Sequence, residues 1–186
     1  MQTHLAECIT SLNNLKEEAS LAFQKLSEKQ LNWKPSPKSW SVAECMHHLL
    51  IVFDKYEHAV ESGLAKAEKT MSPKTYKTSF LGKIFLNFVK PNYTLKTPSP
   101  TALHPTQSVY AKEIVFEYVT YLERVIYFAQ KAQDLSVDIN KVKVPSSVSK
   151  LIKFNLGDYF KIELWHNLRH FNQMLRVCNE PDFPKS

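Results

Sequence analysis

Trp165-His166-Asn167-Leu168-Arg169-His170-Phe171-Asn172-Gln173, close to the end of the chain, has the pattern of a buried helix. At helical spacing, one apolar stripe comprises Leu164, Leu168, Phe171 and Leu175, and a second, on nearly the opposite side, comprises Tyr159, His166, His170 and Val177. A helix that is apolar on two sides is largely buried. The stretch is therefore typical of a helix packed inside a bundle, and we expect this helix to span about residues 155–179.

Three earlier segments have the same helical spacing of apolar residues, at about 2–27, 41–69 and 108–132. Ser41-Val42-Ala43-Glu44 is a capping box, in which serine and glutamate side chains satisfy each other's backbone donors, and it fixes the start of the second helix. Asn155 is the expected N-cap of the last. The sequence predicts an all-α fold, a four-helix bundle in a single domain over 1–186, with a long crossover insertion at about 70–107 between the second and third helices.

The insertion has features of its own. Residues 80–89 have the spacing of a short amphipathic helix, and a proline-rich stretch follows them. Loops of this length in compact domains are usually functional or disordered, so we expect this one to form part of a pocket wall or a lid. A helical turn is also expected near 148–154.

Composition limits the classes of function. The net charge of +6 comes mostly from seven lysines between Lys66 and Lys96, against the single acid Glu68. Such a stretch is most simply a solvated loop, with an anionic membrane as an alternative partner. We see no recognition helix or groove lined by basic and aromatic residues, which argues against nucleic acid. Three cysteines without paired spacing, no signal-peptide pattern and no membrane-length apolar run predict a cytoplasmic protein.

The histidines carry the chemistry. His166 and His170 are four residues apart, so their side chains share one helix face, about 5–6 Å apart at Cβ. On the second helix, His48 falls on the flank of the apolar stripe, whereas His47 points away and is expected in solvent. An isolated pair of this kind arises often by chance, and a single histidine on an apolar face is usually a hydrogen-bonded core residue. We expect the remaining histidines to be surface or loop residues: His4, His58 and His104.

Two motifs resemble those of the DinB-like superfamily of metal-dependent enzymes, which are four-helix bundles. Leu31 to Pro35, followed by Trp40 to Leu49, is similar to the segment that leads into the family's second helix, where a Trp-Ser pair precedes a ligand histidine. The spacing from Trp40 gives that role to His48. His166-x-x-x-His170, followed by Gln173, resembles the family's C-terminal motif of two ligand histidines and a glutamine. The superfamily includes bacillithiol-type thiol transferases and a mycothiol-dependent isomerase.

The resemblance implies a three-histidine site for a divalent metal ion, with His48, His166 and His170 as ligands. The sequence does not choose among zinc, nickel, iron and manganese. Glu163 and Gln173 flank the pair and are candidates to orient an imidazole through its second nitrogen. No general base can be assigned.

Such a site fits either a hydrolase or a thiol S-transferase acting on a small molecule. The apolar residues Phe80, Phe85 and Tyr93 of the insertion hint at an apolar or amphipathic substrate. A homodimer is expected from related bundles. The alternative is a non-catalytic binding or scaffold protein whose histidines are structural or vestigial.

Overall fold

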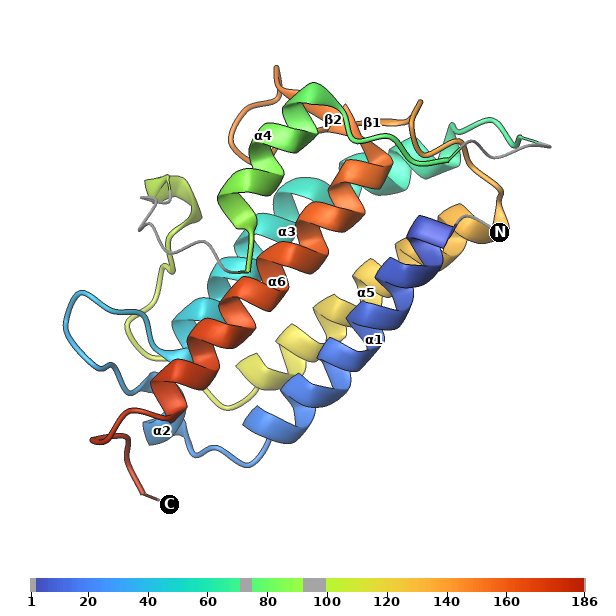
Figure 1. Cartoon of the computed structure of the whole chain (residues 1–186). Coiled ribbons are helices and arrows are strands. Elements are labelled where there is room, and N and C mark those ends of the chain that lie inside the picture. Colours follow the sequence, from blue (N-terminus) through green and yellow to red (C-terminus); the bar gives the residue numbers. More distant parts are fainter. Residues whose placement is uncertain (1–2, 71–74, 92–99, 186) are drawn as a thin grey trace.

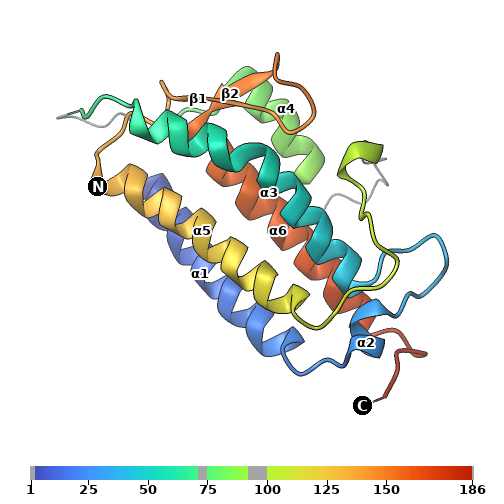
Figure 2. The ribbon, with the colours of Figure 1, turned by 180° about the vertical axis from the view of Figure 1, so that it is seen from behind.

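The computed structural model describes residues 3–70, 75–91 and 100–185. Its helices and strands, in chain order, are α1 (Thr3–Phe23), α2 (Glu28–Asn32), α3 (Val42–Ala65), α4 (Phe80–Val89), the 3₁₀ helix η1 (Thr101–Leu103), α5 (Ile114–Asp134), β1 (Lys143–Pro145), β2 (Lys153–Asn155) and α6 (Leu156–Cys178). Helices α1, α3, α5 and α6 lie side by side along their lengths (Figures 1 and 2). The predicted all-α bundle of four long helices is confirmed within the described residues.

The two helices that carry the histidine motifs both start at fixed points. In α3, the Glu44 amide donates to Oγ of Ser41 over 3.1 Å, and the Ser41 amide donates to the Glu44 carboxylate over 2.8 Å. In α6, Asn155 and Asp158 form the same reciprocal cap. These caps satisfy backbone donors that the first turn of a helix leaves without partners. The predicted capping box and N-cap are therefore confirmed, and they set the register of each histidine.

Three predicted helix boundaries are wrong. The second helix ends at Ala65 and not near residue 69. The first helix ends at Phe23 and not near residue 27, because Ser27 caps the separate short helix α2 through a capping box with Gln30. The third begins at Ile114 and not at 108. Ahead of it, the backbone of Tyr110 bonds twice to the side chain of Asn32, which holds this segment outside a helix.

The connection between α5 and α6 differs from the prediction as well. Residues near 148–154 do not form a helical turn; instead β1 and β2 pair antiparallel, with Val144 opposite Phe154. Both of these side chains are buried, whereas Lys143 and Lys153 are exposed. Pairing with β1, a segment outside the predicted turn, therefore sets the conformation of residues 153–155.

The predicted helix at 80–89 forms as α4 and packs against α6 and β2 (Figure 1). Asp158 at the start of α6 accepts hydrogen bonds from the Tyr76 hydroxyl, at 2.7 Å, and from the Ser79 amide, at 3.2 Å. At Gly82, an added Cβ would lie 2.2 Å from Cγ of Asp158. Glycine thus allows α4 to approach the first turn of α6 closely, which places the insertion along the bundle.

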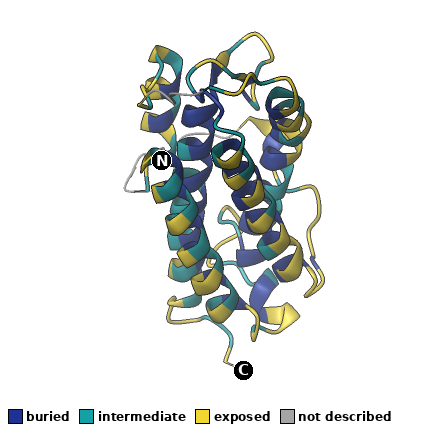
Figure 3. Ribbon diagram, turned by 90° about the vertical axis from the view of Figure 1, so that its right-hand side faces the viewer, coloured by how far each residue is buried: buried dark blue, intermediate teal, exposed yellow. Residues whose placement is uncertain are grey.

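The long helices turn their buried residues toward one another (Figure 3). None of the helices in the described part of the chain is long and apolar enough to cross a membrane. All three cysteines have free thiols, with Cys8 and Cys45 buried and Cys178 partly exposed.

Candidate metal centre

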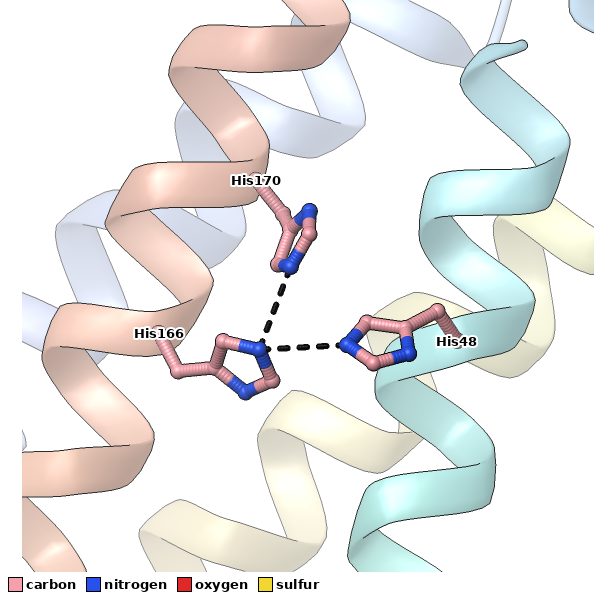
Figure 4. A group of neighbouring side chains, drawn as sticks. All are labelled: His48, His166 and His170. Atoms are coloured by element: carbon pink, nitrogen blue, oxygen red, sulfur yellow. Dashed lines mark hydrogen bonds between the residues drawn. The ribbon is translucent and has the colours of Figure 1, made fainter. Parts of the chain in front are cut away.

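The three histidines singled out in the sequence meet between α3 and α6 (Figure 4). His48 projects from α3, and His166 and His170 project from successive turns of α6. Nε2 of His166 lies 3.2 Å from Nε2 of His48 and 3.1 Å from Nε2 of His170. One nitrogen from each ring lies within 4.8 Å of the others. The structure thus brings together residues that are more than a hundred positions apart in the sequence.

The second nitrogen of two of these rings is held by a hydrogen-bond acceptor. Nδ1 of His48 lies 2.7 Å from the main-chain carbonyl oxygen of Leu103, in η1. Nδ1 of His170 lies 3.1 Å from Oε1 of Gln173, one turn further along α6. A carbonyl oxygen can only accept, so each Nδ1 carries the proton, and each Nε2 presents its lone pair to the centre.

This arrangement fits a metal ion better than it fits a hydrogen-bonded core. With Nδ1 protonated on His48 and His170, both Nε2 atoms are acceptors, and the single proton that Nε2 of His166 can carry reaches only one of them. A cation at the centre would satisfy all three lone pairs. Two nitrogen ligands of a tetrahedral zinc ion, each about 2.0–2.1 Å from the metal, lie roughly 3.3 Å apart, close to the spacings seen here.

The electrostatic environment keeps the three rings neutral. Burial lowers the pKa of His48 to about 4, against the opposing effect of its hydrogen bond to Leu103. The pKa values of His166 and His170 are also held well below the usual histidine value, first by burial and then by the neighbouring imidazoles and Arg169. Neutral imidazole is the form that binds a metal, so no proton has to be displaced from Nε2 at neutral pH.

The three rings form part of the wall of a cavity of about 760 Å³. Its other walls come from the segment before α3, from α4, from η1, from the β1–β2 connection and from further residues of α6, and they include Trp40, Phe85, Leu103, Val148 and Arg169. The Trp40 ring lies beside two of the imidazoles, with centroids 4.9 Å from His48 and 6.0 Å from His170. The insertion therefore forms part of the pocket wall, which was one of its two predicted roles, the other being a lid.

The two residues predicted to orient the imidazoles differ in position. Gln173 contacts His170 as described. Glu163 lies instead in the core between α5 and α6, where it accepts a 2.6 Å hydrogen bond from the Tyr121 hydroxyl. Its other oxygen, Oε1, has no hydrogen-bond partner within the described chain, so no contact to an imidazole supports the predicted role. Burial raises the pKa of Glu163 to about 7.

Of the other four histidines, two are exposed and two are half-buried. His58 is exposed, as predicted, and His104 is exposed at the cavity wall. His47 is half-buried and not in open solvent, because its Nδ1 lies 3.0 Å from the Tyr110 hydroxyl. His4 is likewise half-buried, stacked on Tyr76 and hydrogen-bonded to the Gly157 carbonyl. The sequence pattern missed these contacts, because Tyr110 and Tyr76 lie in segments outside the regular helices and Gly157 is far from His4 in sequence.

Sequence reasoning did not identify every residue at the centre. The Leu103 carbonyl was missed, because a main-chain acceptor has no side-chain signature. Arg169, which lines the cavity and donates to the Phe88 carbonyl of α4, was quoted in the motif without a role. Of the insertion residues predicted near a substrate, Phe85 lines the cavity, Phe80 is exposed, and Tyr93 lies outside the described residues.

Comparison with known proteins assigns the chain to a family. Neither the curated proteins nor the solved structures gave a match. A family model, that of the DinB superfamily, matches residues 12–174, a range that includes all three histidines and the insertion. The match spans most of the chain, and it joins the two motifs that first suggested the resemblance. The chain therefore belongs to the DinB superfamily.

Proposed function

We propose that this protein is a metal-dependent enzyme that transfers a small thiol to an apolar substrate, with His48, His166 and His170 as the metal ligands. The observation that carries the proposal is the convergence of three Nε2 lone pairs on the wall of a wide cavity. A structural metal site is closed by four protein ligands, whereas three ligands beside a cavity leave a position for a reactant. When bound, a divalent ion supplies Lewis acidity that lowers the pKa of a thiol or a water beside it.

The residues around the three histidines prepare the site for such an ion. Leu103 and Gln173 hold the Nδ1 protons of His48 and His170, so these two rings keep the tautomer that points Nε2 inward. The ring of Trp40 packs beside His48 and His170 and limits the approach of water from that side. The chain thus fixes the orientation of two of the three ligands before anything binds.

The cavity supports an apolar or amphipathic substrate. Its wall on the side of α4 and the hairpin includes Phe85, Val89, Val148 and Ile162. Toward the other end of α6, the lining includes Lys38, Arg176 and Glu180. An apolar group is favoured at the first end, because its burial there gains about 25 cal/mol per Å² of surface removed from water.

Thiol transfer is preferred over hydrolysis because the cavity has no carboxylate near the imidazoles. Among the described lining residues the one acid is Glu180, which lies beyond the end of α6 and ten positions after His170, roughly 15 Å at the rise of a helix. Hydrolysis usually needs a positioned general base to take a proton from water. A thiol whose pKa has been lowered is already a nucleophile and attacks without one.

Metal analysis and a thiol-transfer assay test the proposal together. The untagged protein is purified, its metal content measured, and conjugation of a small thiol to an apolar electrophile followed before and after chelation. We expect about one ion per chain and a rate that chelation removes and added zinc, nickel or manganese restores. His170→Ala should abolish both. His58→Ala, on the exposed side of α3, is the matched control and should change neither.

Hydrolysis is the second candidate, and His104 favours it. This imidazole lines the same cavity, with its ring 5.9 Å from that of Trp40. It is the described residue best placed to accept a proton from water. If the metal-loaded protein cleaves an apolar ester and His104→Ala slows that cleavage while thiol transfer is absent, hydrolysis replaces thiol transfer. If metal stays well below one per chain and cannot be restored, both candidates fail and the non-catalytic alternative stands.

A further inference from the structure

Helix α4 has a second apolar face, which points away from the bundle. Leu86 is buried, and Phe85 and Val89 line the cavity. The other side carries Phe80, Ile84 and Phe88 at a spacing of four residues, and they are 79%, 38% and 47% exposed; Phe88, at the edge of this side, also lines the cavity. Residues four apart lie on one face of a helix, so these three form a continuous apolar stripe in solvent. The bundle does not account for it.

The connection between β1 and β2, which lies beside α4, carries two further exposed apolar side chains. Val148 is 47% exposed and Leu151 is 94% exposed. The hairpin lies next to α4, since the rings of Phe85 and Phe154 are 5.5 Å apart and Val148 lines the same cavity as Phe88 (Figures 1 and 2). We call the surface formed by Phe80, Ile84, Phe88, Val148 and Leu151 the α4–hairpin face.

The segments that form this face carry positive charge only. The sequence has no aspartate or glutamate from 69 to 112 or from 139 to 157. In the described parts of these two segments, the exposed lysines include Lys77, Lys83, Lys90, Lys143, Lys150 and Lys153. An apolar stripe bordered by lysines on a short amphipathic helix is the arrangement that lies in the interface of an anionic bilayer.

We propose that the α4–hairpin face docks onto a bilayer surface that contains anionic lipids. Phe80, Ile84 and Leu151 would enter the boundary between head groups and acyl chains, and the lysines would contact the lipid phosphates and carboxylates. The proposal goes beyond the metal-dependent reaction and does not require it. The cavity beside the face gives docking a use, because a substrate held in the bilayer would reach Phe85 and Phe88 first.

Two other occupants fit the observations less well. A second copy of the chain, paired through the same face, would bring like-charged lysines together, which disfavours an isologous contact. A nucleic acid would use the lysines and could stack bases on Phe80 and Phe88, but it would leave the aliphatic side chains of Ile84, Val148 and Leu151 without a partner. A bilayer uses both the charge and the aliphatic groups.

Vesicle flotation with the full chain tests the proposal. Vesicles of phosphatidylcholine with about 30% phosphatidylserine are compared with phosphatidylcholine alone, at low and high salt. We expect flotation with the anionic vesicles at low salt, and much less with neutral vesicles or high salt. Phe80→Glu with Leu151→Glu should reduce binding at least tenfold. Lys83→Gln with Lys153→Gln should weaken it about 25-fold, at about fivefold per lysine.

The matched control is Leu21→Glu with Phe116→Glu, which adds the same charges at side chains 73% and 74% exposed on α1 and α5. This control should float with the anionic vesicles almost as well as the wild type, apart from a small effect of its lower net charge. Chelation should leave flotation unchanged, which separates this result from any failure of the metal site. No flotation with anionic vesicles, equal flotation with neutral ones, or equal loss in the control would overturn the proposal. So would a dimer in lipid-free solution that Phe80→Glu with Leu151→Glu dissociates, or tight binding of single-stranded DNA that the same variant abolishes.

Discussion

His48 donates its Nδ1 proton to the main-chain carbonyl of Leu103 across 2.7 Å. The bond ties the ligand on α3 to the end of the insertion, fifty-five residues further along the chain. One side chain is thereby linked to two functions. Its Nε2 faces the other imidazoles, and its Nδ1 anchors a segment of the cavity wall.

The corresponding contact on α6 predicts a loss of metal affinity in Gln173→Leu. Leucine has no acceptor for the Nδ1 proton of His170, so the ring loses the partner that fixes its tautomer and orientation. Loss of such an orienting partner typically weakens metal binding 10–100-fold, an order-of-magnitude guide. Competition with a chromophoric zinc chelator measures the affinity. Gln173→Glu keeps an acceptor oxygen and should retain most of it; equal weakening in both variants would assign the residue to packing alone.

Acid should destabilise the metal-free protein through the buried imidazoles. The pKa of His48 falls from 6.5 to about 4 in the folded chain, so the unfolded chain binds the proton first. The His48 contribution, about 3 kcal/mol, is therefore lost as the pH falls below 6.5, and its loss levels off near pH 4. Urea unfolding in the presence of a chelator measures it. His48→Asn should flatten this slope, whereas an unchanged slope would show that His48 is not buried in its neutral form.

Glu163 should act in the opposite direction. Its pKa rises from 4.5 to about 7 on folding, so the folded chain holds the proton longer than the unfolded chain does. Stability therefore falls as the pH rises through this window, and the cost above it is on the order of 3 kcal/mol. Glu163→Gln keeps an acceptor for Tyr121 and removes the charge. The gain in free energy of unfolding over the wild type should be larger at pH 8 than at pH 5, as measured by urea unfolding with a chelator present.

Glu18→Gln, at an exposed position on α1, is the control for Glu163→Gln and should show no such difference. A Glu163 variant that follows the wild type at both pH values would mean that the carboxyl group is solvated or paired with a cation. The direction of the pH dependence also separates the two buried groups: lowering the pH reduces stability through His48, and raising the pH reduces it through Glu163.

Local sequence signals predicted the helices that hold the ligands. The Ser41 and Asn155 caps and the helix at 80–89 follow from contacts within a few residues, which a sequence pattern records. The spacing of His166 and His170, together with the family resemblance that gave the third role to His48, then identified the three residues that converge. Most of what failed depends on partners distant in sequence, although the Ser27 capping box of α2 is local and was missed. Tyr110 bonds to Asn32 and His47, and the strand at 153–155 needs its partner at 143–145.

Glu163 shows the limit of flanking position as a guide. It is three residues before His166 and on the buried side of α6, which suggested a contact with an imidazole. The hydroxyl of Tyr121, from α5, takes that carboxylate instead. A helix position gives the direction of a side chain, but the neighbouring helix decides what it meets.

Anomalous X-ray diffraction from crystals of the zinc-loaded protein tests the central claim most directly. The account predicts one strong zinc peak between α3 and α6, about 2.0–2.1 Å from Nε2 of His48, His166 and His170, with at least one further position open to the cavity. A peak bound by other residues, or intact Nε2 contacts with no peak at saturating zinc, would contradict it.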